Sequence, residues 1–275
     1  MNYDPKTHKF PFPEDTDKHY ITVKKDNGLV FDEKYPYIDD SAFFRFKKAL
    51  VRFLLYILVF PVATVRMGLR IRGRENLKKH KELLKQGAIS CSNHVHFWDY
   101  ICIMKAIRPF KPYVIVWSRN IRGENGTVSR LTGGIPFPDD NIHGAGAFLR
   151  AVRKMLNGGW LHIYAEGSMW EYYKPIRPFK SGAGSLAVRT KKPIVPLAFS
   201  YREPGFIRKK IFHQIALFDL NIGEPIFVDE TLSPSEKEND ITKRAHDEVC
   251  RLAGIDPGEN LYPPIFNNSK RVDYY

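Results

Sequence analysis

The sequence predicts an α/β fold, with a mixed, partly parallel sheet flanked by helices and a further helix near the N-terminus. Short apolar runs typical of buried strands alternate with helix-like segments. Polar residues able to do chemistry follow two of these runs, in residues 92–100 and at Glu166, and parallel sheets bind ligands at such strand ends. The chain has 275 residues, 43% of them hydrophobic, which is enough for one sizeable domain.

Residues 1–40 are predicted to form an extended arm. They contain several prolines, scattered charges and the turn signal Asp26-Asn27-Gly28, without helical periodicity. A short hairpin is predicted around this turn, with residues 20–23 on one side and 29–31 on the other. The segment 254–275, polar and proline-containing, is predicted to be a peripheral tail.

Residues 41–69 are predicted to be helical. An apolar run at 53–65 follows several basic residues, and Arg66 and Arg70 come after it. The run has about 13 apolar residues and contains Pro61, whereas a bilayer span needs about 20. One interpretation is a buried core helix. The alternative, favoured by the basic flanks, is a helix lying in the membrane interface.

Residues 70–253 carry the alternating pattern of the main domain. Pro136 and Pro138 make 134–139 a constrained segment, better suited to the wall of a site than to a central strand, and Pro196 predicts an edge strand or a bulge. The predicted helices are 77–86, 98–107, 141–157, 181–190 and 233–253, and the predicted strands are 88–91, 113–117, 160–164 and 193–199. A loop or short helix is predicted at 120–134, and a hairpin-like stretch at 207–220.

The charge balance limits the partners. Lysine and arginine outnumber aspartate and glutamate by 43 to 30, giving a net charge of +13. Such a surplus favours anionic partners, and because no nucleic-acid motif accompanies it, an anionic membrane surface is the predicted one. A non-enzymatic basic module remains an alternative. Three widely separated cysteines, and an N-terminus without the layout of a secretory signal, predict an intracellular protein with free thiols.

His94 and Asp99 are the candidate catalytic pair. On one continuous helix, five positions at roughly 100° each would leave them about 140° apart. They meet only if a strand ends at His94, the chain turns, and a helix begins near Asp99, where the helix dipole favours a carboxylate. The arrangement predicts a histidine polarised as a base.

A rival hypothesis is a metal-dependent hydrolase that uses His94, His96 and Asp99 as ligands. The spacing argues against it, because the metallo-hydrolase signature places its aspartate two positions after the second histidine and here the gap is three. No metal and no cofactor are therefore predicted. His162, inside a predicted strand, is expected to be a core residue.

Four motifs follow one another along the chain: Asn93-His94 with Asp99, Gly134-Ile135-Pro136-Phe137, Glu166-Gly167-Ser168 and Val195-Pro196-Leu197. In this order they resemble the motifs of the glycerolipid acyltransferases related to bacterial 1-acylglycerol-3-phosphate acyltransferase. The resemblance covers roughly residues 70–230, and segments with Phe179-Lys180 and with Gly223-Glu224-Pro225 also fit it.

This resemblance implies acyl transfer in phospholipid biosynthesis, from acyl-CoA or acyl carrier protein to a lysolipid hydroxyl. His94 would be the general base and Asp99 would orient it, while the nucleophile belongs to the substrate. Glu166, Gly167 and Ser168 would bind the acceptor. Backbone N–H groups near Gly134 or Gly167 would stabilise the oxyanion. The enzyme is expected at the cytoplasmic face of a membrane, as a peripheral or monotopic protein.

The motifs also depart from the family pattern. Members that bind glycerol phosphate usually carry arginines where this chain has Asp139-Asp140 and Met169, and carboxylates repel a phosphate. The most favoured acceptor is still 1-acylglycerol-3-phosphate, and a non-phosphate acceptor such as a glycolipid is the alternative. Three cations in the loop after Glu166 are expected to supply the missing charge: Lys174, Arg177 and Lys180. Arg119 lies where the family often has a lysine, and it is expected to keep that charge for substrate binding.

Overall fold

The computed structural model describes residues 26–139 and 141–258. Within them, one mixed sheet has the strand order β1-β7-β6-β2-β5-β3-β4. All neighbouring strands are parallel except β6 and β7, which are antiparallel, so the predicted fold class is confirmed. The strands are β1 Arg70–Arg72, β2 Ala88–Ser92, β3 Pro112–Trp117, β4 Gly134–Phe137, β5 Trp160–Tyr164, β6 Ile194–Arg202 and β7 Leu217–Ile222.

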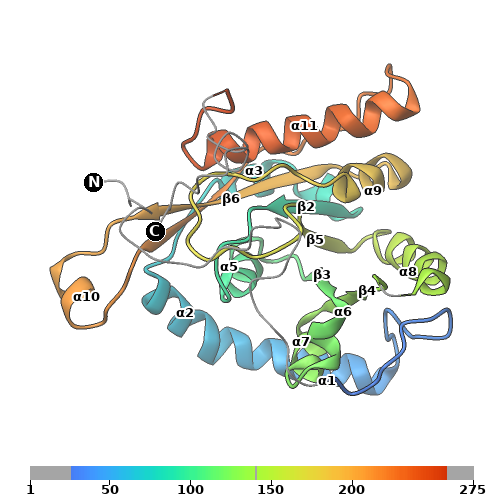
Figure 1. Cartoon of the computed structure of the whole chain (residues 1–275), viewed down its shortest axis with the longest axis horizontal. Coiled ribbons are helices and arrows are strands. Elements are labelled where there is room, and N and C mark those ends of the chain that lie inside the picture. Colours follow the sequence, from blue (N-terminus) through green and yellow to red (C-terminus); the bar gives the residue numbers. More distant parts are fainter. Residues whose placement is uncertain (1–25, 140, 259–275) are drawn as a thin grey trace, which may run out of the picture.

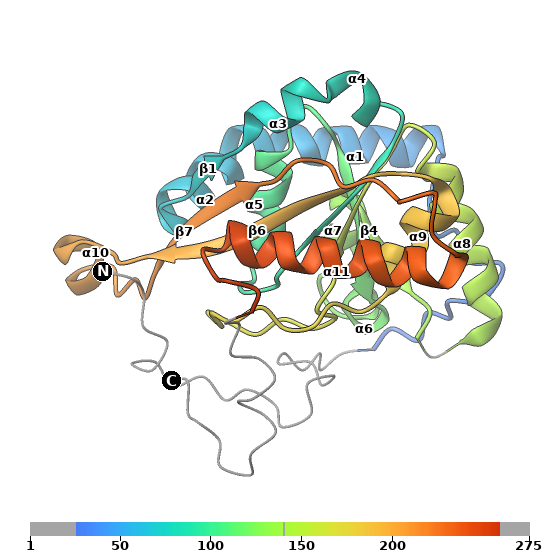
Figure 2. The ribbon, with the colours of Figure 1, turned by 90° about the horizontal axis from the view of Figure 1, so that it is seen from above.

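Helices cover both faces of the sheet (Figures 1 and 2). One face packs against α8 (Ile142–Met155), α9 (Gly182–Thr190) and α11 (Pro234–Leu252). The other packs against α3 (Arg74–Lys79), α4 (Lys81–Leu84) and α5 (Asp99–Ala106). The short helices α6 (Ser118–Arg122) and α7 (Gly126–Thr132) connect β3 to β4, and α10 (Phe206–Lys210) lies between β6 and β7.

Alternation along the strands explains the two-sided core. Ile89 and Cys91 of β2 face the α9 and α11 side, whereas Ala88 faces the α5 side. In β6, Val195 and Leu197 likewise belong to the α5 side. Successive side chains of a strand point to opposite faces, and a sheet covered on both faces needs apolar residues at both sets of positions.

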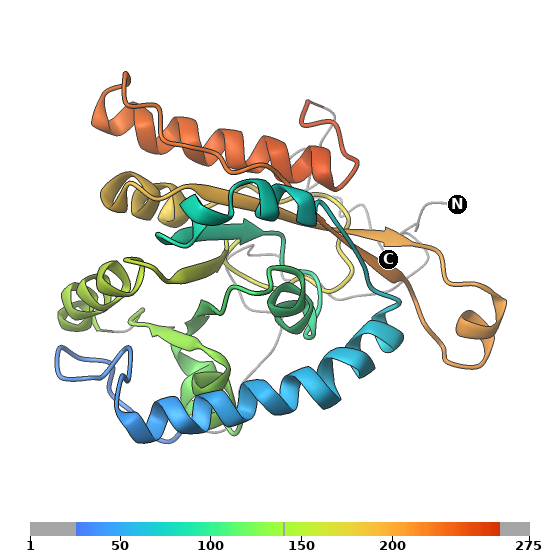
Figure 3. The ribbon, with the colours of Figure 1, turned by 180° about the vertical axis from the view of Figure 1, so that it is seen from behind.

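A long helix lies outside α5 (Figure 3). It consists of α1 (Ala42–Leu54), a π-helical turn η2 (Leu55–Val59) and α2 (Phe60–Met67). Pro61, which has no backbone N–H to donate, directly follows the start of α2 after the π-helical turn, where the regular i to i−4 bonding is already interrupted. The helix is therefore longer than the predicted apolar run. Its 26 residues are long and apolar enough to cross a membrane, so the prediction that the segment is too short is wrong.

Other predictions need correction. Pro196 does not mark an edge strand, because β6 lies between β2 and β7. Pairing with β7 begins at Leu197, one residue after the proline, which explains how an interior strand accommodates it. The predicted helix 77–86 is broken at His80 between α3 and α4. Segment 134–137 is a strand, at the edge of the sheet as its prolines suggest.

The arm and tail are only partly described. Residues 29–31 form no strand; Phe31 instead packs fully buried into the core beside α8. The other predicted half of the hairpin, residues 20–23, and most of the tail lie outside the described residues. Ser233 caps α11 through a capping box with Glu236, as the predicted start at 233 requires.

Candidate active site

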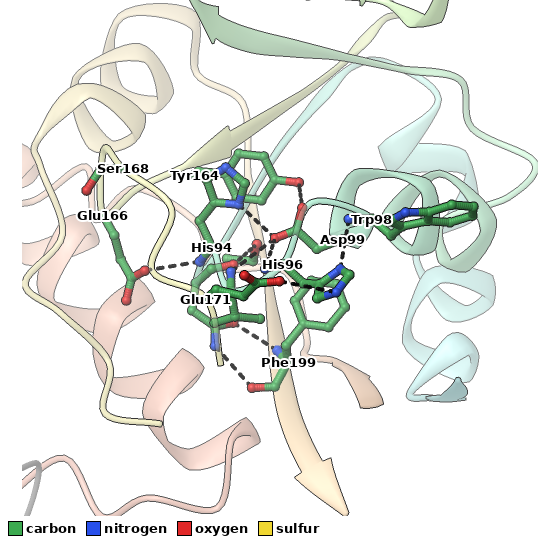
Figure 4. A network of polar contacts seen from close by, with 12 residues as sticks. His94, His96, Trp98, Asp99, Tyr164, Glu166, Ser168, Glu171 and Phe199 are labelled. Atoms are coloured by element: carbon green, nitrogen blue, oxygen red, sulfur yellow. Dashed lines mark hydrogen bonds and ion pairs between the residues drawn. The ribbon is translucent and has the colours of Figure 1, made fainter. Parts of the chain in front are cut away.

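The turn between β2 and α5 brings the predicted pair together (Figure 4). β2 ends at Ser92, α5 begins at Asp99, and residues 93–98 form the β2–α5 corner between them. Nδ1 of His94 lies 2.7 Å from Oδ2 of Asp99. The predicted strand, corner and helix start are confirmed.

Asp99 closes the corner with its side chain. Oδ2 also accepts backbone N–H groups from Val95 at 3.1 Å and His96 at 3.3 Å, and the Tyr164 hydroxyl donates to Oδ1 at 2.5 Å. Burial raises the pKa of Asp99, but the positive charge of His94 and these hydrogen bonds outweigh burial and bring the pKa below its ordinary value. Asp99 is therefore a buried carboxylate that stays ionised.

The Asp99 contact fixes how His94 presents its ring. An ionised carboxylate can only accept, so Nδ1 carries a proton and Nε2 keeps its lone pair. Within the described part of the chain, Nε2 has no hydrogen-bond partner, and the side chain is 23% exposed. The ring stacks on Tyr164 with centroids 3.7 Å apart. His94 is thus held as a base with its free nitrogen available to a ligand.

Glu166 and Arg177 form a buried ion pair beneath the corner. Oε2 of Glu166 accepts from the His94 N–H at 3.0 Å and from Nη2 of Arg177 at 3.1 Å. Oε1 accepts from the Arg177 N–H at 2.8 Å. Arg177 also donates to the hydroxyl and carbonyl of Ser168. The expected acceptor-binding residues are therefore committed to one another, and they hold the backbone of His94.

This geometry gives Arg177 a different role from the expected one. Its guanidinium is 2% exposed and lies over the Trp170 ring, with Cζ 4.4 Å from the ring centroid. A phosphate would have to displace a buried carboxylate to reach it. Drawing Arg177 away from Glu166 would leave a buried charge without its partner, which is strongly unfavourable. Arg177 is therefore better described as the partner of Glu166 than as a phosphate ligand.

Three further residues support the corner through contacts that the motifs do not predict. Asn93 ties the end of β2 to β6 through two hydrogen bonds with the Phe199 backbone, at 3.1 and 2.9 Å. Trp170 donates its backbone N–H to the His94 carbonyl at 3.0 Å. Tyr164 was detectable only as the last residue of a buried strand, immediately before the Glu166 motif.

His96 points away from the pair. Its Nδ1 accepts the Trp98 N–H at 3.0 Å, and Nε2 lies 3.5 Å from Oε1 of Glu171. Burial lowers the pKa of His96 to about 4, which keeps the ring neutral. Among the described residues, no group of three or more His, Cys, Asp or Glu side chains is placed to hold a metal ion. His162 is fully buried against Ser90, as expected for a core residue.

The two predicted oxyanion donors are not placed for that role. Gly134 begins β4, paired with Val114, while the ligand edge of this parallel pair lies three residues on at Phe137. That separation is about 10 Å along the strand. Gly167 has a φ of 84°, and its N–H donates to the Tyr164 carbonyl at 3.0 Å, so it is not available to an oxyanion. The turn that positions Glu166 needs this positive φ, which glycine adopts without steric cost.

The remaining predicted cations lie around the carboxyl ends of the strands. Lys174 and Lys180 belong to the loop between β5 and α9 that also carries Glu166, and Lys180 packs over Gly167. Arg119 lies in α6, directly after β3, with Cζ 5.4 Å from the Trp117 ring centroid. The Trp117 indole donates to Asp139 at 2.8 Å, so a carboxylate is fixed at the same edge.

Comparisons with known proteins agree with this geometry. The family model described as Acyltransferase matches residues 68–200, which include β2, the β2–α5 corner, β5 and most of β6. The solved structure of the 1-acyl-sn-glycerophosphate (LPA) acyltransferase PlsC from Thermotoga maritima is similar, with a TM-score of 0.51 and 20% identity. The match covers 79% of this chain and 84% of that one, and it shows a common fold.

No curated protein sequence matches the chain. The assignment therefore depends on the family match and on the geometry within it. The matched range contains both members of the His94 and Asp99 pair and the Glu166 motif that supports them. Residues 68–200 of this chain match the acyltransferase family model, and the fold around them is that of a PlsC-like acyltransferase.

Proposed function

We propose that this acyltransferase moves a fatty acyl group from a CoA or acyl-carrier-protein thioester to a free hydroxyl of 1-acylglycerol-3-phosphate. The observation that carries the proposal is the His94–Asp99 contact of 2.7 Å, which leaves Nε2 of His94 as the available base. Similarity of fold to a 1-acylglycerophosphate acyltransferase supports the acceptor class. The product would be a diacylated phospholipid precursor.

The reaction follows from the position of the proton. Nε2 of His94 takes the proton of the acceptor hydroxyl as its oxygen attacks the thioester carbonyl carbon. The tetrahedral intermediate collapses, the carbon–sulfur bond breaks, and the thiolate takes the proton back from His94. Asp99 stabilises the imidazolium during the exchange, and since the substrate supplies the nucleophile, no acyl-enzyme forms.

The long helix is proposed to lie in the membrane interface. Its exposed face carries Phe46, Phe53, Leu58 and other large apolar side chains, while its opposite face packs on α5 through Phe60. Spanning the bilayer would require the helix to leave the domain. Lying along the surface keeps this packing and buries the apolar face in lipid. The cytoplasmic face is the proposed side.

A second acceptor class has a specific observation in its favour. The Asp139 carboxylate, fixed by Trp117, lies at the edge where ligands of parallel sheets bind, and it would repel a phosphate. A monoacylated glycolipid would not meet this repulsion. Lys174, Lys180 and Arg119 are the cations proposed to offset Asp139 if the acceptor carries a phosphate.

The test is an acceptor screen with wild type and His94→Ala. Purified protein is given a thioester donor with a labelled acyl group, either acyl-CoA or acylated acyl carrier protein. The acceptor is lysophosphatidate, lysophosphatidylcholine or a monoacylated glycolipid. Labelled diacyl product and thiol release are expected with lysophosphatidate, and only with wild type. Full turnover by His94→Ala would overturn the mechanism. Product from the glycolipid alone would replace the acceptor but keep the mechanism.

His143→Ala is the matched control for this substitution. His143 is an exposed histidine at the start of α8 and takes no part in the β2–α5 corner. It reports any general effect of removing an imidazole. Its turnover is expected to equal that of wild type.

A further inference from the structure

The connection between β6 and β7 exposes a group of large apolar side chains. This segment, residues 203–216, is called the β6–β7 tip and contains α10. Phe206 is 76% exposed, Ile207 62%, Ile211 65% and Phe212 67%. Figures 1 and 3 show the tip projecting past the sheet, beyond the end of α2. Single exposed apolar residues are normal on a protein surface, but four large ones grouped on one connection mark an interaction site.

Hydrogen bonds fix the tip against the end of the long helix. Nη1 of Arg208 donates to the Val65 carbonyl at 2.8 Å and to Oε1 of Gln214 at 2.9 Å. The Gln214 side chain donates to the carbonyl of Arg66. Both carbonyls belong to the last turn of α2, and that of Val65 also accepts the N–H of the capping residue Gly68 at 3.2 Å. The tip is therefore held in a set position relative to the apolar face of the helix.

The same junction adjoins the β2–α5 corner. Cζ of Arg66 lies 5.9 Å from the ring centroid of Trp98, the residue before Asp99. Phe97, between the two histidines and Asp99, is 67% exposed. The contact between Arg66 and Trp98 is thus flanked along the chain by two exposed apolar residues, Val65 at the helix end and Phe97 at the corner. A surface that covered the helix and the tip would pass beside the site that holds His94.

The charges of the tip indicate what this surface contacts. Arg208, Lys209 and Lys210 follow one another in α10, and the acid near them, Glu203, lies 3.7 Å from Lys209. Two phenylalanines and two isoleucines beside a run of cations fit the boundary of an anionic bilayer, with rings among the acyl chains and cations at the head groups. The chain as a whole, at +13, is attracted to the same surface.

We infer that the β6–β7 tip is a second membrane contact, inserted beside the long helix into an anionic bilayer. This inference deepens the proposed membrane location of the helix. A single helix lying on a bilayer leaves the domain free to roll about the helix axis. A second contact displaced from that axis removes the rotation, so the β2–α5 corner stays at the lipid surface from which its acceptor comes.

An environment-sensitive fluorophore placed on the tip tests the inference. The three native cysteines, Cys91, Cys102 and Cys250, are buried, so Ile211→Cys provides an accessible thiol in the full chain for a nitrobenzoxadiazole label. Lys243→Cys, exposed on α11 across the sheet from the long helix, is the matched control. With phosphatidylglycerol-containing vesicles, the label at 211 is expected to shift to shorter wavelength and brighten, and the label at 243 to stay unchanged.

A second variant measures how much the tip contributes. Phe206→Ser combined with Phe212→Ser is expected to weaken co-sedimentation with the same vesicles by about tenfold or more, because two large apolar groups no longer leave water. Phosphatidylcholine vesicles are expected to bind the wild type more weakly. The thermal unfolding curve of the double variant shows whether it is folded, and the labelled Ile211→Cys protein reports the contact without removing it.

Two results would overturn the inference. One is a label at 211 that does not respond although the labelled protein sediments with vesicles. The other is a label that responds to a soluble acidic acyl carrier protein and not to vesicles, which would make the tip a protein-docking site. Acyl transfer in detergent micelles is measured separately, so a failure of the proposed reaction is recognised apart from a failure of the membrane contact.

Discussion

The hydroxyl of Tyr164 donates to Oδ1 of Asp99 at 2.5 Å, while His94 contacts the other oxygen of the same carboxylate. The Tyr164 ring also stacks on the His94 imidazole, at 3.7 Å between centroids and an interplanar angle of 11°. One side chain from the end of β5 thus touches both members of the proposed catalytic pair. Tyr164 is a positioning residue, since it acts on the reaction through His94 and Asp99.

Tyr164→Phe keeps the stacked ring and removes the hydrogen bond. A hydrogen bond to a charged group contributes about 1.5–3 kcal/mol, so the free energy of unfolding is expected to fall by about that amount. If the transition state loses about half of this stabilisation, kcat/KM is expected to fall roughly tenfold. The dependence of kcat/KM on pH is expected to change, because Asp99 loses one of the hydrogen bonds that lower its pKa.

Tyr100→Phe is the matched control. The Tyr100 hydroxyl is buried and donates to the carbonyls of Pro112 and Thr132, away from Asp99. Its loss is expected to lower stability without moving the pH profile. Equal pH profiles for Tyr164→Phe and wild type would show that the Tyr164 hydroxyl only stabilises the fold.

Asp99→Asn should separate the charge of the carboxylate from its shape. The neutral carboxamide cannot stabilise an imidazolium. Where its amino group faces His94, it donates to Nδ1 and favours the tautomer in which Nε2 carries the proton. The kcat is expected to fall by about a thousandfold to ten-thousandfold, as for the aspartate of a serine hydrolase triad. Single-turnover measurements of thiol release check this. A loss smaller than about tenfold would mean that Asp99 acts on the fold of the corner alone.

The sequence was sufficient to predict the contact between His94 and Asp99 and the class of fold. These two residues could be placed because a strand, a corner and a helix start each leave local signals, and because parallel strands end at one edge. Glu166 could be placed at the same edge for that reason. The mixed sheet followed from the alternation of strands and helices.

The details that failed depend on contacts between distant segments. Pro196 has local properties of an edge residue, but its neighbours β2 and β7 are set by the whole topology. Arg177 looked like a free cation because its buried partner, Glu166, is brought to it by the loop. Tyr164 gave no signal, because a tyrosine at the end of a buried strand is ordinary until Asp99 is seen beside it.

Substitutions of Arg177 are expected to affect stability and turnover, whereas substitutions of the two nearby lysines are expected to affect acceptor binding. Arg177→Leu leaves the Glu166 carboxylate buried without its partner, so the free energy of unfolding is expected to fall by about 3–5 kcal/mol. Arg177→Lys is expected to impair turnover equally with phosphate and non-phosphate acceptors, since it disturbs the backbone of His94. Chemical unfolding and steady-state kinetics measure these effects.

Lys174→Ala and Lys180→Ala, on the same loop, are the comparison. Each is expected to raise the KM for lysophosphatidate by up to about tenfold and to leave the KM for a glycolipid unchanged, as loss of a rim charge would. A selective loss of lysophosphatidate binding in Arg177→Lys, with stability unchanged, would instead make Arg177 the phosphate ligand.

Chelation should leave the reaction unaffected. The proposed base is activated by Asp99, and the alternative ligand His96 is turned toward Glu171. Turnover after exhaustive treatment with EDTA or phenanthroline is expected to equal that of untreated protein. Activity that disappears on chelation and returns with one metal ion per chain would revive the metal-dependent hydrolase hypothesis.

The two buried neutral histidines predict how stability depends on pH. Burial lowers the pKa of His162 to about 3 and that of His96 to about 4, against an ordinary value of 6.5. Between about pH 6.5 and 4 the unfolded chain therefore binds protons that the folded chain does not. The free energy of unfolding is expected to be greatest above pH 6.5 and to fall as pH decreases, by up to about 1.4 kcal/mol per pH unit for each histidine.

Urea unfolding at several pH values isolates the part due to His162. His162→Gln keeps groups that can bond Ser90 and Ser92 but cannot titrate, so its stability is expected to be lower at neutral pH and to fall less steeply with acid. His143→Gln, at an exposed site, is expected to keep the wild-type slope. An unchanged slope in His162→Gln would mean that His162 gains its proton in the folded protein as readily as in the unfolded chain.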